Sequence, residues 1–323
     1  MKRIAVYTSG GDAPGMNAAL RAVVRSGIYY GMEVTGILNG LEGMIDGEFI
    51  NLDAAYVSNI IQRGGTILKT SRSPRFLTKS GMEAAATHLQ NHLIDGIIAL
   101  GGDGTFRAAT AFKEYCSLPV IGIPCTIDND LAGTDFTIGY DTAINTVVEA
   151  VDKIRDTADA HNRLFFVEVM GRDSGKIALI SSIASGAEAV LIPESITDTE
   201  HLYHILEKGW NRKKSSYIII VAEGDEAGGA VAIANKVKEK FSQYDTRVTI
   251  LGHIQRGGNP SCMDRVIATR LGVVAVESLI GNRSHEMVGI INNKVVYTPF
   301  NNAVKTGQEI DESLLKLTTI LSS

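Results

Sequence analysis

Short runs of apolar, often β-branched residues recur along the chain, and each precedes a turn signal and a helical pattern. Such runs predict strands of parallel sheets, because these strands are covered on both faces. We expect strands at Ile4–Thr8, Gly96–Leu100, Val120–Ile123, Leu164–Met170, Ala189–Ile192, Tyr217–Ala222 and Thr246–Leu251.

Helical patterns lie between these runs, at Met16–Tyr30, Phe106–Tyr115 and Thr142–Thr157. Strands that alternate with helices predict an α/β fold of two doubly wound, three-layer α/β/α domains with mostly parallel sheets. The longest helix begins near a plausible break at 138–140. The domains that we expect are a larger one from 1–138 plus about 252–305, and a smaller one from 139–251 plus about 306–323.

Composition narrows the class of protein. The 323 residues correspond to two domains at about 150 residues each. The net charge of −5 argues against a general nucleic-acid or membrane-surface binder. Three cysteines without a C-x-x-C pair fit a reducing compartment, and no apolar run reaches the ~18 residues of a membrane span. The first apolar run is too short for a signal peptide, so we expect a cytoplasmic protein.

Two glycine-rich loops follow predicted strands and lead into predicted helices. Gly10-Gly11 follows the first strand, and Gly101-Gly102-Asp103-Gly104 follows the second. Glycines let backbone amides approach a phosphate, and a helix N-terminus favours negative charge. Either loop alone is equally well explained as a tight turn. In open α/β sheets ligands bind beyond the carboxyl ends of strands, so two such loops together favour an anion site.

The common nucleotide fingerprints are incomplete. In Gly175-Lys176 the lysine is followed by Ile177, so the strict phosphate-loop pattern is absent. In Gly102-x-Gly104 the third glycine of the dinucleotide pattern is replaced by Arg107. A nicotinamide-dependent dehydrogenase is therefore disfavoured.

The loop Thr126-Ile127-Asp128-Asn129-Asp130 places two carboxylates two residues apart, so that in an extended loop they point the same way. Phosphoryl transfer needs one carboxylate to deprotonate the attacking hydroxyl and another near magnesium. An Asx-turn is the structural alternative. Arg163, Arg172, His253 and Arg256 lie near predicted strand ends, where arginine is suited to phosphate.

Five segments together resemble the phosphofructokinase family of bacterial, ATP-dependent type, and their order and spacing match from about residue 2 to residue 280. The segments are Thr8–Ala19, Gly101–Thr105, Thr126–Asp130, Met170–Arg172 and Gly252–Gly258. The resemblance implies Mg²⁺-dependent transfer of the γ-phosphate of ATP to the 1-hydroxyl of fructose 6-phosphate, which yields fructose 1,6-bisphosphate and ADP.

The resemblance also implies roles for residues. Asp128 would be the base, Arg172 would stabilise the phosphoryl group, and Thr126 and Asp130 would position substrate and metal. The larger domain would hold the nucleotide and magnesium through Gly11, Arg72, Ser73, Gly102, Asp103, Gly104 and Thr105, with Asp103 as the metal ligand. Sugar-phosphate positions, assigned mainly to the smaller domain, are Thr126, Asp128, Arg163, Met170, Gly171, Arg172, Glu223, Arg247, His253 and Arg256.

The resemblance implies self-association, because Arg163 and Arg247 match arginines that reach the sugar phosphate from a neighbouring subunit. We expect a homotetramer. An effector site for ADP or phosphoenolpyruvate would use Arg21, Arg25, Arg155, Gly186, Glu188 and Lys214. Ala54 and Asn59 replace an arginine and an acid that are usual in the family, so we expect weakened or altered effector control.

Two positions bear on the phosphoryl donor. Gly104 is typical of ATP users, whereas pyrophosphate users carry an aspartate that would repel the α-phosphate. Cys125 stands where ATP users carry glycine and pyrophosphate users carry lysine, and it matches neither. We expect ATP, with a pyrophosphate-dependent enzyme as the alternative.

Two further alternatives stay open. NAD and lipid kinases share the Gly-Gly-Asp-Gly element but lack Met170-Gly171-Arg172. A non-catalytic regulatory subunit of a phosphofructokinase would be expected to lose Asp128 or Arg172, and both are present.

Overall fold

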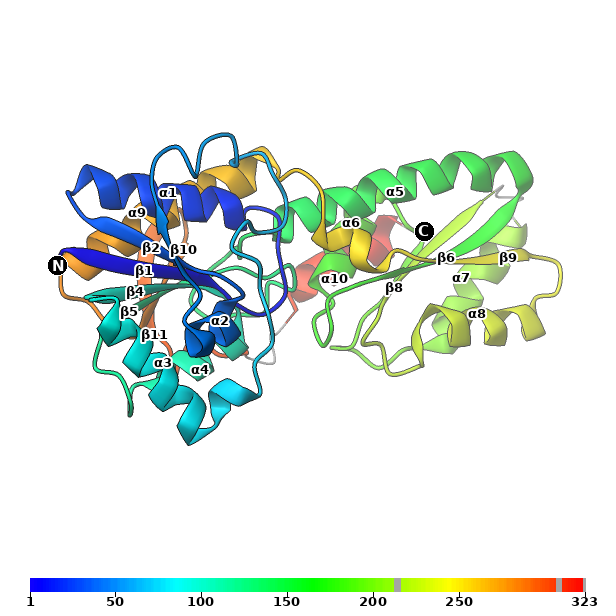
Figure 1. The fold of residues 1–323 in the computed structure, drawn as a ribbon. Helices are drawn as coiled ribbons and strands as arrows, with labels where there is room; N and C mark the ends of the chain where they lie inside the picture. The colour runs from blue at the N-terminus through cyan, green and yellow to red at the C-terminus, as the bar shows by residue number, and fades with distance from the viewer. Residues whose placement is uncertain (212–215, 306–309, 322–323) are drawn as a thin grey trace. The chain divides into compact units, whose positions relative to one another are not determined.

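A computed structural model describes residues 1–211, 216–305 and 310–321. The chain divides into two compact units (Figure 1). Unit 1 comprises Met1–Thr142 and Arg256–Thr306, and unit 2 comprises Ala143–Gln255 and Gly307–Ser323. The first division falls inside the long helix α5 (Tyr140–His161). The assignment of nucleotide to one unit and sugar phosphate to the other stays a prediction.

Unit 1 contains a seven-stranded sheet in the order β11-β10-β5-β4-β1-β2-β3. Its five central strands are parallel, and the two edge strands β3 and β11 are antiparallel to their neighbours. The strands are β1 (Arg3–Thr8), β2 (Glu33–Ile37), β3 (Phe49–Leu52), β4 (Gly96–Gly101), β5 (Val120–Pro124), β10 (Glu286–Ile291) and β11 (Lys294–Pro299).

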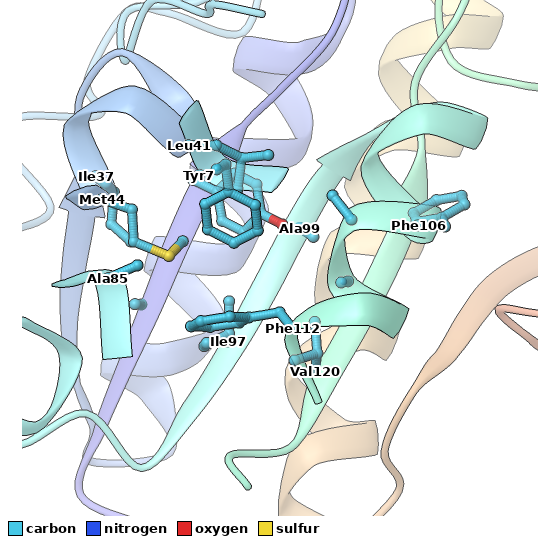
Figure 2. Close-up of a cluster of buried hydrophobic side chains, with 14 of the residues drawn as sticks. Tyr7, Ile37, Leu41, Met44, Ala85, Ile97, Ala99, Phe106, Phe112 and Val120 are labelled. Atoms are coloured by element: carbon cyan, nitrogen blue, oxygen red, sulfur yellow. The ribbon is translucent and has the colours of Figure 1, made fainter. Parts of the chain in front are cut away.

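Helices cover both faces of this sheet. Helices α1 (Met16–Tyr29) and α9 (Cys262–Ile280) pack together on one face, where Leu279 lies close to Gly96 of β4. The opposite face carries α2 (Gly40–Asp46), η1 (Arg75–Leu77), α3 (Lys79–Asn91) and α4 (Asp103–Phe112). Alternate strand residues, such as Tyr7 and Ala99, point into the apolar core on that side (Figure 2).

Unit 2 is built on a four-stranded parallel sheet in the order β7-β8-β6-β9. The strands are β6 (Arg163–Val169), β7 (Ala189–Leu191), β8 (Tyr217–Ala222) and β9 (Asp245–Ile250). Helices α7 (Thr199–Asn211) and α8 (Gly229–Lys240) bury Leu206 and Ile233 against one face. Helix α6 (Lys176–Ser185) contacts β7 and β8 and also α10 (Glu312–Leu321). The short helix η2 (Gly252–Arg256) crosses a unit boundary.

The predicted α/β class is confirmed, and each of the seven expected strands forms within one residue of its expected ends. The sheet of unit 1 is more mixed than expected, because β2, β3, β10 and β11 were not predicted. Helix α4 ends at Phe112 rather than Tyr115, since the chain then turns. Among the described residues, no helix is long and apolar enough to cross a membrane.

Candidate active site

In unit 1, the two glycine loops meet beyond the carboxyl ends of β1 and β4, which are adjacent strands. The N–H of Ser9 donates to the carbonyl of Leu100 (2.9 Å). The hydroxyl of Thr105, in the first turn of α4, donates to the carbonyl of Ser9 (3.3 Å). The two loops are therefore joined directly by hydrogen bonds.

Glycine is required where these loops approach each other. A Cβ atom at Gly101 would lie 2.6 Å from the Ser9 carbonyl oxygen, and Gly10 has a φ of +86°. Gly104 differs, because no atom lies within 4 Å of the position that its Cβ would take. The start of α4 thus has open space beside Gly104, with Asp103 in its first turn.

The third loop follows β5, the other neighbour of β4. Asp128 is only 3% exposed, and its N–H donates to Thr126 Oγ1 (3.2 Å). Cys125 forms a parallel bridge with Ile138, and the Thr126 N–H donates to the Ile138 carbonyl (3.1 Å). Thr126 lies beside Gly102, since a Cβ there would be 3.7 Å from the Thr126 Cβ. Three predicted loops therefore share one edge of the sheet.

Two acidic residues of this edge already carry cationic partners. Asp130 is 7% exposed and its Oδ2 lies 3.0 Å from Lys305 Nζ. Asp103 Oδ1 accepts a hydrogen bond from Arg107 Nε (2.9 Å) and one from the Lys305 N–H (3.4 Å). Lys305 is distant in sequence and belongs to none of the motifs, so its place at this edge was not predictable from local sequence.

Three other predicted residues of unit 1 are Arg256, beside the first glycine loop, and Arg72 and Ser73, in the irregular segment before η1. Arg256 Nη1 donates to the Asp12 carbonyl (3.3 Å) and would be only 2.5 Å from a Cβ at Gly11. Arg256, predicted to bind sugar phosphate, therefore packs against the loop predicted to bind nucleotide. Arg72 is exposed, and Ser73 Oγ accepts the N–H of Phe76 at the start of η1 (3.0 Å).

In unit 2, Met170-Gly171-Arg172 is held at the end of β6 through its backbone. Glu223 Oε1 accepts the N–H groups of Arg172 (2.8 Å) and Gly171 (3.3 Å). The buried Gln255 accepts the Met170 N–H (3.3 Å). Arg172 itself is exposed and has a φ of +52°. Glu223 thus positions this segment, a role that sequence alone did not indicate.

The remaining cationic positions of unit 2 lie on β6, on the edge strand β9 and on η2. Asp245 bridges Arg163 Nε (2.8 Å) and Arg247 Nη2 (2.9 Å). The hydrogen bond from Arg163 lowers the pKa of the Asp245 carboxyl. His253 is exposed. Arg163 and Arg247 therefore meet at one exposed carboxylate, that of Asp245.

Comparison with known proteins identifies the family. Residues 3–279 match the phosphofructokinase family model. A relative from Cytophaga hutchinsonii named ATP-dependent 6-phosphofructokinase is 56% identical over 317 residues, 98% of this chain and 97% of that protein. The chain belongs to the phosphofructokinase family. A Thermus thermophilus phosphofructokinase, named ATP-dependent 6-phosphofructokinase 1, is 52% identical over 322 residues, 100% of both chains.

Among solved structures, the phosphofructokinase of Saccharomyces cerevisiae superimposes with a TM-score of 0.88 at 36% identity. The match covers 100% of this chain and 48% of the yeast chain, so this phosphofructokinase spans about half of that length. The resemblance inferred from the five sequence segments is confirmed at the level of the family.

The positions predicted for a phosphofructokinase effector site fall in both units. On α1 of unit 1, Arg21 is partly buried and Arg25 is exposed. In unit 2, Arg155 Nη2 donates to the carbonyls of Ser185 (2.8 Å) and Gly186 (3.0 Å), and its Nη1 lies 3.7 Å from Glu188. Lys214 lies outside the described residues. Effector binding stays a prediction.

Cys125, the unusual residue beside the donor loop, is buried with 1% exposure, and burial raises the pKa of its thiol. Its N–H donates to the carbonyl of Gly101 (2.9 Å). Cys125 therefore resembles a small packing residue at the end of β5 rather than a reactive thiolate.

Proposed function

We propose that this chain transfers the γ-phosphate of ATP to the 1-hydroxyl of fructose 6-phosphate. The observation that carries the proposal is the meeting of three loops at one edge of the unit 1 sheet, where the third loop holds the buried Asp128 and open space lies beside Gly104 at the start of α4. Full-length relatives named ATP-dependent 6-phosphofructokinase support it. The enzyme is a kinase.

The residues fit magnesium as a companion of ATP. Mg²⁺ is usually held by one or two carboxylates together with substrate phosphates and waters. Asp103, partly exposed at the start of α4, supplies one such carboxylate. Among the described residues there is no group of three or more metal-ligating side chains, so a cage made by protein alone is not present there. When bound, magnesium would neutralise charge on the phosphates of the donor.

In the proposed mechanism Asp128 accepts the proton of the sugar hydroxyl. The hydroxyl oxygen forms a bond to the γ-phosphorus, the bond from that phosphorus to the ADP oxygen breaks, and ADP leaves with the electron pair. A sugar hydroxyl is a weak nucleophile at neutral pH, so a positioned carboxylate accelerates its attack. Thr126 and Asp130 belong to the same loop and position the substrate.

Unit 2 supplies cationic groups in this proposal. Arg172 stabilises the transferring phosphoryl group, and Glu223 fixes the backbone of Arg172. Arg163, Arg247 and His253, together with Arg256 of unit 1, bind the 6-phosphate, while Met170 and Gly171 lie beside the sugar. Because this phosphate is remote from the reacting oxygen, its binding contributes orientation.

We further propose a cytoplasmic homotetramer in which Arg163 and Arg247 complete the sugar-phosphate site of a neighbouring subunit. Their place on β6 and on the exposed edge strand β9 supports this proposal. Light scattering coupled to size exclusion tests it, and a monomer that turns over at full rate would contradict it.

The activity is tested by following fructose 1,6-bisphosphate formation from fructose 6-phosphate and Mg²⁺, with ATP and with pyrophosphate in parallel. Activity with ATP alone is expected, because Gly104 leaves room for the α-phosphate. Activity with pyrophosphate alone would overturn the donor. A folded protein that is inactive with both would point to another acceptor or to a regulatory subunit.

A further inference from the structure

The loop that carries Asp128 is held by a short neighbouring segment, residues 137–139. The Thr137 N–H donates to Asn129 Oδ1 (2.8 Å), and the Thr137 hydroxyl donates to the Thr126 carbonyl (2.6 Å). Thr126 and Asn129 flank Asp128 on its two sides. Thr137, which is fully buried, therefore fixes the loop both before and after Asp128.

Asn129 meets three requirements at once. Its backbone lies in the left-handed region with a φ of +48°, which asparagine tolerates better than most residues. Its side-chain oxygen accepts the Thr137 N–H, and its Nδ2 donates to the Asp135 carbonyl (3.0 Å). The residue is 5% exposed. Its amide is thus engaged inside the protein, and its contribution to catalysis would be indirect.

The other end of the segment is anchored by Asp264, in the first turn of α9. Asp264 Oδ1 accepts the Gly139 N–H (2.8 Å), and Oδ2 accepts the Thr142 N–H (2.8 Å) and the Thr142 hydroxyl. The Asp264 N–H donates to Ser261 Oγ, which caps the helix (3.1 Å). Asp264 is 1% exposed. Its carboxylate thus connects α9 to the segment that holds the loop.

We propose that Asn129, Thr137 and Asp264 are positioning residues that hold the Asp128 carboxylate in place for proton transfer. The inference rests on the proposed role of Asp128 as the base. A displacement of about 1 Å can lower a rate by roughly 10²-fold, so loosening this network should reduce kcat. KM for ATP and for fructose 6-phosphate should change little, because the three side chains act within the protein.

The first test compares Asn129→Gly with Asn282→Gly by steady-state kinetics. Glycine tolerates the left-handed backbone at both positions, so each change removes only the side chain. Asn282 also has a positive φ (+59°) but is exposed after α9, which makes it a matched control. We expect kcat to fall about 10- to 100-fold for Asn129→Gly with little change in KM. A kcat within about twofold of that of Asn282→Gly would overturn the proposal.

A second test separates the network from the base. If Asn129 acts through Asp128, adding Asn129→Gly to Asp128→Asn should lower the remaining kcat by less than about twofold, since the two changes disrupt one function. A loss as large as in the wild-type background would overturn the inference and leave Asp128 as the base. Wild-type activity in Asp128→Asn alone would refute the base itself, and the inference with it.

A third test uses a milder pair of variants, in case Asn129→Gly fails to fold. Thr137→Val removes the hydroxyl and keeps the shape, whereas Thr137→Ser keeps the hydroxyl. We expect Thr137→Val to lower kcat and Thr137→Ser to restore it to within about threefold, because the bond to the Thr126 carbonyl returns. Equal kcat values in the two variants would contradict a positioning role for that hydrogen bond.

Discussion

The two sets of candidate site residues, one in each unit, are held in different ways. In unit 1, Asp128 and Asp130 are almost fully buried, on a loop tied by hydrogen bonds to the segment that follows it. In unit 2, Arg172, Arg247 and His253 are exposed. Glu223 holds the backbone of Arg172, and Arg247 forms an ion pair with Asp245. A proton acceptor needs pre-organisation, whereas long cationic side chains reach a phosphate by adjusting.

The largest expected effect on activity is that of substituting Asp128. Asp128→Asn removes the proposed proton acceptor, so kcat should fall about 10²- to 10⁴-fold while KM for both substrates stays within about threefold. Initial-rate kinetics measure both. Because Asp128 is buried, a thermal unfolding curve must show that the variant is folded. Turnover close to that of the wild type would assign the base elsewhere.

A smaller effect on a different parameter is expected in unit 2. Arg247→Gln should raise KM for fructose 6-phosphate about 10- to 100-fold, because a hydrogen bond to a charged group contributes roughly 1.5–3 kcal/mol. The change in kcat should be minor. Arg283→Gln is a suitable control, since Arg283 also forms an ion pair, with Glu286 (2.9 Å). A fall in kcat at unchanged KM would break the distinction between the units.

Two aspartates extend the comparison to pH. Burial raises the pKa of Asp264 in unit 1 to about 6 from its usual 3.8, whereas Arg163 lowers the pKa of the exposed Asp245 in unit 2. The folded protein therefore binds the Asp264 proton more tightly than the unfolded chain. The stabilisation that protonation of Asp264 gives to the folded state is complete below pH 4 and is lost as the pH rises through 6. Asp245 has the opposite pH dependence. Its ionised carboxylate stabilises the folded state, and this stabilisation is lost as the pH falls below the ordinary pKa of aspartate.

Urea unfolding of the wild type and of Asp264→Asn between pH 4 and pH 7 measures the contribution of Asp264 to the free energy of unfolding. The free energy of unfolding of the wild type, relative to that of the variant, should decline with pH at up to ~1.4 kcal/mol per pH unit. A difference that is constant over this range would show that Asp264 titrates normally.

The smallest expected effect concerns ADP and phosphoenolpyruvate. Ala54 and Asn59 replace a cation and an acid expected by resemblance at the effector site, so coupling should be weak. Titration of either compound at subsaturating fructose 6-phosphate should change the rate less than about fivefold, below the usual range of allosteric coupling. Strong activation or inhibition would show that Arg21, Arg25 and Arg155 suffice.

The sequence predicted the parts of the molecule that are encoded locally. Continuous apolar runs identified β1, β4, β5, β6 and β8. A strand that is buried on both faces is apolar along its whole length, so it can be recognised without knowing which strands it pairs with. The antiparallel edge strand β11 was missed, since its exposed face interrupts the apolar run. Helix α9 is apolar on most sides and carries no clear periodicity, so its bounds were not predicted.

The candidate site divides in the same way. Glycine loops and Asp128 were found because short motifs contain them. Lys305, Gln255 and Asp264 gain their significance from contacts with residues 85 to 202 positions away. No local spacing encodes such contacts. The sequence therefore indicated the residues proposed to contact ligands, but it did not indicate the residues that hold those residues in place.

The division of unit 1 into two stretches of sequence has a consequence for synthesis on the ribosome. Strand β5 pairs on one side with β4, but its other neighbour, β10, comes more than 150 residues later, after most of unit 2. Until β10 emerges, the nascent sheet ends in an apolar strand with unpaired backbone groups, the kind of edge that recruits other chains. The unit translated first is therefore among the last to be completed, and chaperone dependence should be concentrated in that interval.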